Sequence, residues 1–179
     1  MENKETSTPI SSDWLPIVLD ADGLFHLAQD NHWHEKVSAK LVLTPHPGEM
    51  ALLTGLSVEE IQADRIGVAR EWAQKWRQVV VLKGALTVIA NPDGRVGVVP
   101  IATSSLAKAG TGDVLAGMIG GLLAQSLDPW EAAAAGAYLH ARAGLCAEEL
   151  IGCSESVTAS DVIRAIPRVY WKLKSNDLP

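Results

Sequence analysis

Three short apolar runs, each ending at once in a polar or glycine-containing turn, most constrain the fold of this chain. They lie at 16–19, 41–43 and 79–82, and helical patterns separate them along the sequence. Short apolar runs bounded by turn signals are typical of buried parallel strands. Strands that alternate with helices imply right-handed crossovers, so the sequence predicts an α/β fold with a mostly parallel sheet.

Two further apolar runs, 86–90 and 96–99, follow the third one closely. Asn-Pro-Asp-Gly at 91–94 separates them, and this strong turn signal predicts an antiparallel hairpin. Ser57 with Glu60 three residues later is a capping-box pattern that predicts a helix start. Helices are expected at 23–29, 57–77, 113–125, 129–150 and 160–166.

Composition excludes several classes of protein. Hydrophobic residues make up 47% of the 179, which is enough for a core and argues against disorder. Acidic residues number 21 against 15 basic ones, so no general nucleic-acid surface is indicated. The longest apolar stretch near a helix, 114–124, is shorter than the roughly 18 residues of a membrane span. Cys146 and Cys153 form no CxxC pair, and the polar N-terminus has no signal-peptide core, so a cytoplasmic location is expected.

Polar residues follow all three predicted parallel strands. They are the segments 20–23, 44–49 and 83–84, and we expect them to converge on one rim, where ligands of open parallel sheets bind. Lys83 could neutralise a phosphate, or it could be a charged strand end in solvent. Asp20 and Asp22 could hold a metal or a ligand, and Asp22 could instead cap the next helix.

The sharpest local element is Gly110-Thr111-Gly112-Asp113, which opens an apolar helix. Glycines let backbone amides approach an oxyanion, and the helix start adds free N–H groups and a positive dipole end. The segment therefore reads as an anion hole for a phosphate. Asp113 beside it could deprotonate a hydroxyl that attacks phosphorus. The alternative is a common aspartate cap after a glycine turn.

His46 lies between two prolines and is followed by Glu49. The prolines stiffen this loop, so the two side chains could serve a substrate or a hydrated Mg²⁺. Alternatively, Glu49 merely favours a helix N-terminus. The other histidines lack any partner pattern and are interpreted as surface or core residues; they are His26, His32, His34 and His140.

Four motifs in this order resemble the ADP/ATP-dependent NAD(P)H-hydrate dehydratase family of the ribokinase-like superfamily. They are VLDADG at 18–23, LTPHPGEM at 43–50, VVLKG at 80–84 and AGTGDVLAG at 109–117. The likeness runs from about Pro16 to Pro167, and Gly-Thr-Gly-Asp alone would match many small-molecule kinases of the superfamily. The resemblance implies a three-layer α/β/α fold of the ribokinase-like type, with the hairpin near 86–99.

The resemblance also implies a function: nucleotide-dependent dehydration of hydrated NADH or NADPH, a carbon–oxygen lyase reaction that repairs the cofactor. The ring hydroxyl would first be phosphorylated from ADP or ATP, with Mg²⁺, and phosphate would then leave. Asp113 matches the family's catalytic aspartate, which also meets the substrate, and Gly110, Thr111 and Gly112 match its anion hole. His46 matches the histidine that meets the hydrated dinucleotide, and Glu49 the carboxylate that acts through the metal's water shell. The residues that match the nucleotide-lining stretch are Lys83, Gly84, Ala85, Leu86 and Thr87, together with Gly112.

This sequence departs from the family pattern in two places. The stretch 100–106 lacks the family's usual asparagines, and family domains carry roughly a hundred further residues before the first motif. We therefore expect a polar lead-in at 1–13, a ribokinase-like domain at 14–168 that lacks its N-terminal part, and a C-terminal tail at 169–179. A sheet without its first strands would expose an edge, so a homo-oligomer, or another chain that supplies the missing part, is expected.

Two other functions stay open from the sequence. One is a small-molecule kinase of the same superfamily that acts on a vitamin precursor or a sugar. The segment His46 to Glu49 argues against it, because such kinases more often have asparagine at the position of His46. The other is a catalytically silent nucleotide-binding subunit, for which the short N-terminal part is the main support.

Overall fold

A five-stranded sheet forms the centre of the molecule in the computed structural model, which describes residues 15–175. The strands lie in the order β1 (Ile17–Leu19), β2 (Leu41–Leu43), β3 (Val79–Leu82), β4 (Val88–Ala90) and β5 (Val96–Val98). β1, β2 and β3 pair in parallel, with Val18 beside Val42 and Leu43 beside Val80. The predicted parallel arrangement of the first three runs is therefore confirmed.

The predicted hairpin is confirmed as β4 and β5, and it makes the sheet mixed rather than mostly parallel. β3 pairs antiparallel with β4, and β4 pairs antiparallel with β5. The connection from Leu82 to Val88 is too short for a crossover helix, so β4 must run back along β3. β1 and β5 are the half-exposed edges of this sheet, and the strands between them are buried.

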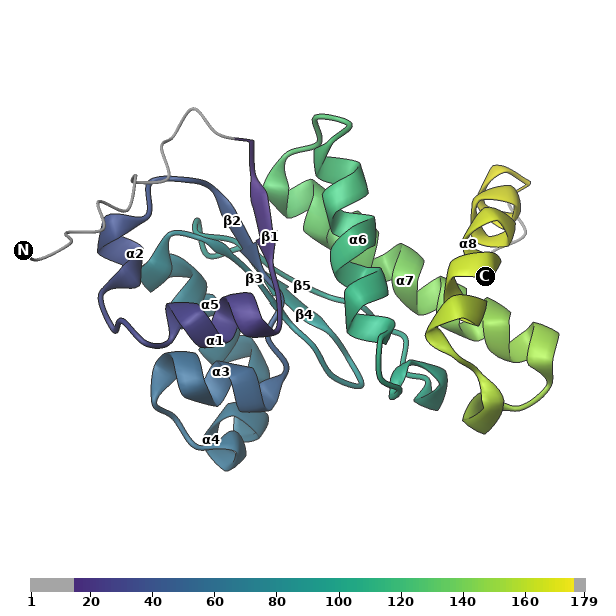
Figure 1. Cartoon of the computed structure of the whole chain (residues 1–179), viewed down its shortest axis with the longest axis horizontal. Coiled ribbons are helices and arrows are strands. Elements are labelled where there is room, and N and C mark those ends of the chain that lie inside the picture. The colour runs from purple at the N-terminus through teal and green to yellow at the C-terminus, as the bar shows by residue number, and fades with distance from the viewer. Residues whose placement is uncertain (1–14, 176–179) are drawn as a thin grey trace, which may run out of the picture.

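Helices cover both faces of the sheet, as Figure 1 shows. One face carries α1 (Asp22–Leu27), α2 (Trp33–Lys36), α3 (Pro47–Thr54), α4 (Val58–Ala63) and α5 (Arg65–Trp76). The other face carries α6 (Thr111–Leu123) and α7 (Pro129–Ile151). The helix α8 (Ala159–Lys174) packs on α6 and α7 through a separate apolar cluster, and short 3-10 turns lie at Ser104–Leu106 and Ser154–Ser156.

Alternation along β3 builds the two cores. Val80 and Leu82 face the core under α1–α5, whereas Val79 and Val81 face the core under α6 and α7. Successive side chains of a strand point to opposite faces, so a continuous apolar run suits a strand that is covered on both sides. The three-layer α/β/α arrangement is thereby confirmed.

The helix predicted over 57–77 is two helices. α4 ends at Ala63 and α5 begins at Arg65, because Asp64 between them leaves helical geometry. The Asp64 carboxylate accepts a hydrogen bond of 2.8 Å from the Gly67 N–H, so it caps α5. The Ser57–Glu60 capping box at the start of α4 is present as predicted.

Three other helices differ from prediction. α2 and α3 were not expected, and Pro47 provides the first residue of α3 behind His46. The last helix continues past its predicted end at Ile166 to Lys174, with Pro167 inside it. Buried Val169 keeps the helix packed beyond that proline. The predicted lead-in at 1–13 lies outside the described residues, and within 15–175 no helix has the length and apolarity to cross a bilayer.

Candidate active site

The ends of β1, β2 and β3 meet on one rim, as the sequence predicts. Lys83, directly after β3, donates a 2.6 Å hydrogen bond from Nζ to Asp20 Oδ1, which follows β1. The Lys83 N–H donates to the carbonyl of Pro45, two residues beyond β2. The Lys83 and Asp20 side chains are 19% and 13% exposed, so this ion pair is largely sheltered from solvent.

Glu49 joins this rim from the first turn of α3. Its Oε2 lies 3.5 Å from Lys83 Nζ and also accepts a 2.7 Å hydrogen bond from the His46 N–H. The Glu49 N–H in turn donates to His46 Nδ1, so the two residues form a reciprocal cap. Glu49 therefore caps the start of α3, and the same carboxylate also contacts Lys83.

Both ring nitrogens of His46 lie near Glu49. Nδ1 accepts the Glu49 N–H, so the ring proton resides on Nε2, which lies 3.5 Å from Glu49 Oε1. The His46 side chain is 56% exposed. An exposed imidazole whose orientation is fixed by its own helix cap is able to meet a bound substrate at this rim.

The start of α6 faces the Lys83–Asp20 pair. Gly110 has a φ of 85°, a left-handed conformation that suits glycine, and it turns the chain into the helix. A Cβ on Gly112 would lie 3.5 Å from both Asp20 Oδ2 and Lys83 Nζ. No side chain of the described residues caps this helix start, and Asp113 is exposed in its first turn. The amides and the positive helix end therefore point toward a rim that also carries a lysine.

Thr111 supports this turn from inside. Its side chain is buried, and its Oγ1 lies 2.7 Å from the Leu106 carbonyl and 2.8 Å from the Lys108 carbonyl. Its N–H also donates to Lys108. The hydroxyl and the N–H of Thr111 thus both hold the preceding loop.

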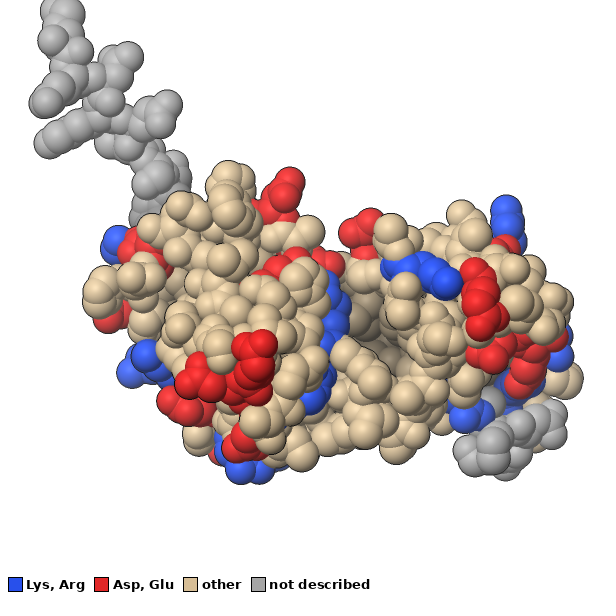
Figure 2. Space-filling model, turned by 90° about the horizontal axis from the view of Figure 1, so that it is seen from below, with Lys and Arg blue, Asp and Glu red and all other residues tan. Residues whose placement is uncertain are grey.

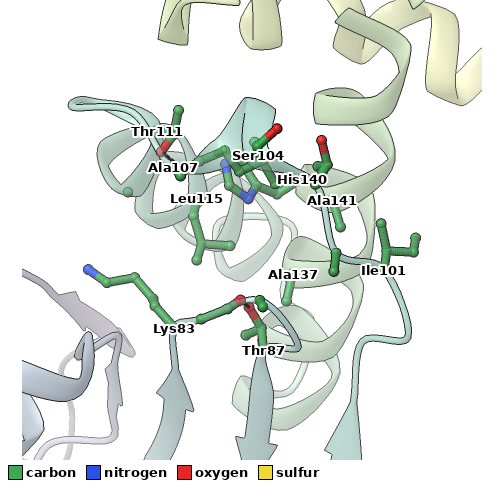
Figure 3. A pocket seen from close by; sticks show the side chains of 16 residues that line it. Lys83, Thr87, Ile101, Ser104, Ala107, Thr111, Leu115, Ala137, His140 and Ala141 are labelled. Carbon is green, nitrogen blue, oxygen red and sulfur yellow. Dashed lines mark hydrogen bonds between the residues drawn. The ribbon is translucent and has the colours of Figure 1, made fainter. Parts of the chain in front are cut away.

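A pocket of about 470 Å³ opens beside this turn. The loop after β3, the segment 101–107 and the facing sides of α6 and α7 line it (Figure 3). Six of the predicted site residues belong to the lining: Lys83, Gly84, Ala85, Thr87, Thr111 and Gly112. Leu86 does not line it and is 47% exposed, and His46, Glu49, Gly110 and Asp113 also lie outside the lining. The site is therefore a pocket with a polar rim at one end.

The surface around the site is concave. Figure 2 shows a hollow between the part built on the sheet and the part built on the C-terminal helices, with basic side chains at its margin. The lining of the pocket is apolar toward α7, where Ala137 and Ala141 lie, and carries the charge of Lys83 at its other side. This polarity suits a ligand with an anionic end and a less polar body.

The segment 100–106, which lacks the family's asparagines, is held by a carboxylate of α7. Thr103 Oγ1 and Ser105 Oγ donate to the same oxygen of Glu148, at 2.8 Å and 2.9 Å. Thr103 also accepts from the Ser105 N–H and caps the 3-10 turn. Hydroxyls therefore fix this wall of the pocket.

Arg65 is a site residue that the sequence did not indicate. Its Nη2 lies 3.0, 3.2 and 3.3 Å from the carbonyls of Leu82, Lys83 and Leu86, so it clamps the loop after β3. Burial lowers the pKa of the Arg65 guanidinium. A Cβ on Gly84 would lie 2.6 Å from the same nitrogen, so glycine is needed for this approach. No local pattern reveals a contact between a helix and a loop so far along the chain.

His140 is the second missed residue. It was interpreted as a surface or core side chain, yet it lines the pocket from α7 and is only 7% exposed. Burial lowers the pKa of the imidazole to about 4, and a hydrogen bond with the backbone of Thr111 acts in the opposite direction. The small residues Ala137, about one turn before it, and Ala141, directly after it, were the sequence signal that room exists around this ring.

A family model described as NAD(P)H-hydrate dehydratase matches residues 3–168. A bifunctional NAD(P)H-hydrate repair enzyme of Moorella thermoacetica is 46% identical over 160 residues, which are 89% of this chain and 30% of that enzyme. An ADP-dependent (S)-NAD(P)H-hydrate dehydratase of Neisseria meningitidis is 41% identical over 158 residues, which are 87% of this chain and 52% of that enzyme. This chain thus spans about half of the single-function relative.

Solved structures agree with these relatives. The ADP/ATP-dependent NAD(P)H-hydrate dehydratase of Bacillus subtilis, co-crystallised with ATP and Mg²⁺, superposes with a TM-score of 0.76 at 40% identity, over 88% of this chain and 55% of that one. A ribokinase-like superfamily protein of Enterococcus faecalis gives a TM-score of 0.69 at 29% identity, over 89% of this chain and 52% of that one. The predicted ribokinase-like fold is confirmed.

Proposed function

We propose a function from one premise: this chain belongs to the NAD(P)H-hydrate dehydratase family, whose model matches residues 3–168. The proposed activity is the nucleotide-dependent dehydration of hydrated NADH or NADPH. The observation that carries it is the junction at Gly112, where the pocket meets the uncapped start of α6 and the Lys83–Asp20 pair. The relatives named as dehydratases supply the substrate class.

The nucleotide occupies the pocket in this proposal. Its terminal phosphate lies at Lys83 and at the α6 amides, with Gly110, Thr111 and Gly112 as the anion hole. Its remaining part follows the loop of Lys83, Gly84, Ala85 and Thr87, which Arg65 clamps. Leu86 would act at the mouth of the pocket, because its side chain is exposed.

Asp113 takes the proton from the ring hydroxyl as its oxygen attacks the terminal phosphorus. The new O–P bond forms while the phosphoanhydride bond breaks, so ADP leaves as AMP. The phosphate then departs with the C–O bond electrons, and a proton is lost from the neighbouring ring carbon to restore the double bond. The sum converts hydrate and ADP into reduced nucleotide, AMP and phosphate. The exposed position of Asp113 in the first turn of α6, directly after the proposed anion hole, supports this role.

His46 and Glu49 serve the other side of the rim. The exposed His46 ring would hydrogen-bond the hydrated dinucleotide through Nε2, which would give up its 3.5 Å approach to Glu49 Oε1, since the helix cap holds Nδ1. Mg²⁺ fits here only as an ion that keeps most of its waters, because the described residues hold no group of three or more His, Cys, Asp or Glu able to bind a metal. Such an ion takes one or two carboxylates plus substrate phosphates. Glu49 would hold it through water, and the ion would offset phosphate charge.

A second copy of this chain, or another chain, is proposed to cover the β1 edge of the sheet. β1 is half-exposed with no strand on its outer side among the described residues, and Leu15 and Phe25 are 80% and 52% exposed. Unpaired strand edges and exposed apolar side chains favour association. Light scattering of the purified chain tests this, and a monomer at micromolar concentration would contradict self-association.

The free thiols of Cys146 and Cys153 support placing the protein in a reducing cytoplasm.

The test of the function is a direct assay. Purified chain is mixed with hydrated NADH, ADP and Mg²⁺, and the absorbance of reduced nicotinamide is followed, with ADP omitted as the control. We expect ADP-dependent recovery of the absorbance. Nucleotide binding without recovery would overturn the proposal in favour of a silent binding subunit. Phosphorylation of a vitamin precursor alone would overturn it in favour of a kinase.

A further inference from the structure

His140 presents a buried polar group that the proposed mechanism does not use. The residue is 7% exposed, and its Nε2 is buried without a hydrogen-bond partner among the described residues. Figure 3 shows the ring projecting from α7 toward the pocket, near Leu115 and across from Lys83 and Thr87. A buried polar nitrogen without a hydrogen-bond partner is energetically unfavourable. Because this nitrogen lies beside a ligand pocket, we expect a bound ligand to provide the missing partner.

The imidazole acts here as a neutral hydrogen-bonding group. Burial disfavours its charged form, and no acidic side chain is among the residues that line the pocket with it. A neutral ring has one donor and one acceptor nitrogen, and the backbone of Thr111 engages one of them. The other nitrogen can hydrogen-bond a neutral polar group of a ligand. Because the ring is uncharged, it cannot form an ion pair with a phosphate.

The surroundings of His140 favour a base and a sugar over a phosphate. Ala107, Leu115, Ala137 and Ala141 form most of the wall beside it, together with Ser104, so this part of the pocket is mainly apolar. Positive charge and helix-start amides lie elsewhere, at Lys83 and Gly112. Apolar walls with one placed polar group are typical of sites that hold and orient a nucleoside.

We infer that His140 hydrogen-bonds the nucleoside portion of the nucleotide, through a ribose hydroxyl or through the polar edge of adenine. This inference rests on the proposed nucleotide site. It makes His140 a specificity-determining residue, because an analogue that lacks the matched group would leave the buried nitrogen unpaired.

Calorimetric titration tests this with the full chain and four ligands: ADP, 2′-deoxy-ADP, 3′-deoxy-ADP and IDP. The variants are His140→Leu and His140→Asn, with His26→Leu, an exposed histidine, as the matched control. We expect His140→Leu to weaken ADP binding about tenfold, the scale of one lost buried hydrogen bond. One of the three analogues should bind the unchanged chain about tenfold more weakly than ADP binds it. The same analogue and ADP should bind the His140→Leu variant with equal affinity. A hydroxyl analogue in that role identifies the ribose, and IDP identifies the base.

Other outcomes overturn the inference. Equal weakening of ADP and every analogue by His140→Leu would assign the residue a structural role at Thr111, and unchanged affinity would remove any role. Thermal unfolding of each variant checks the fold, and His140→Asn, which keeps a polar group, carries the same comparison if the leucine variant does not fold. Failure of the unchanged chain to bind ADP at all would instead refute the proposed function, and the inference with it.

Discussion

Lys83 is the residue through which the parts of the site meet. Its ammonium contacts carboxylates that follow two different strands, Asp20 after β1 and Glu49 after β2, while its backbone N–H donates to Pro45 in the same segment as Glu49. A largely sheltered positive charge between two carboxylates holds the rim together, and it faces the start of α6 across Gly112. In the proposed function, a phosphate that enters this place would replace part of the contact between Lys83 and the two carboxylates.

The buried imidazole of His140 predicts a pH dependence of stability. Its pKa of about 4 lies below the value of 6.5 for an unfolded chain, so the unfolded state binds more protons between these values. The contribution of the neutral ring to stability is full above pH 6.5 and is lost as the pH falls toward 4. From pH 7 to pH 5 we expect the unchanged chain to lose about 2 kcal/mol more than His140→Leu, measured by urea unfolding. Equal losses of unfolding free energy in the two proteins would show that this ring does not control the loss of stability at acidic pH.

At the scale of elements, the sequence predicted the helices and strands that follow from local patterns, and it missed the features that depend on contacts between distant segments. Apolar runs located all five strands, and the Asn-Pro-Asp-Gly turn located the hairpin. The break at Asp64 was missed because the apolar face of a helix continues through this residue. In the structure Asp64 leaves helical geometry after α4, and its carboxylate caps the start of α5 through the Gly67 N–H. α8 was predicted too short because Pro167 normally stops a helix, yet its packing on α6 and α7 continues.

Arg65 couples α5 to the loop between β3 and β4, which predicts an effect on nucleotide binding. Arg65→Lys keeps the charge but cannot reach three carbonyls with one planar group, so the loop should loosen. We expect the affinity for ADP to fall several-fold while the maximal turnover changes less. Calorimetry measures the affinity, and steady-state kinetics measure the separate effects on KM and kcat. Arg70→Lys, at an exposed position of the same helix, is the control. If both variants behave alike, Arg65 does not position the loop.

The whole molecule places its site where the two halves of the chain meet. The strands and α1–α5 supply Asp20, Glu49 and Lys83, whereas α6 and α7 supply Gly112 and His140 from the other side of the sheet (Figure 1). The sequence identified the rim because strand ends of a parallel sheet share one edge. It could not identify the pocket wall, since the distance between α7 and the loop after β3 depends on how helices pack.

In the proposed function the whole molecule also separates two tasks, because the nucleotide would occupy the pocket and Asp113 lies outside its lining. The most direct test measures ADP affinity and turnover together in Asp113→Asn, with Asp93→Asn, an exposed hairpin residue, as the control. Our prediction is ADP binding close to that of the unchanged chain and turnover lower by about a hundredfold or more, the scale of a lost general base. Equal losses of affinity and turnover would contradict it.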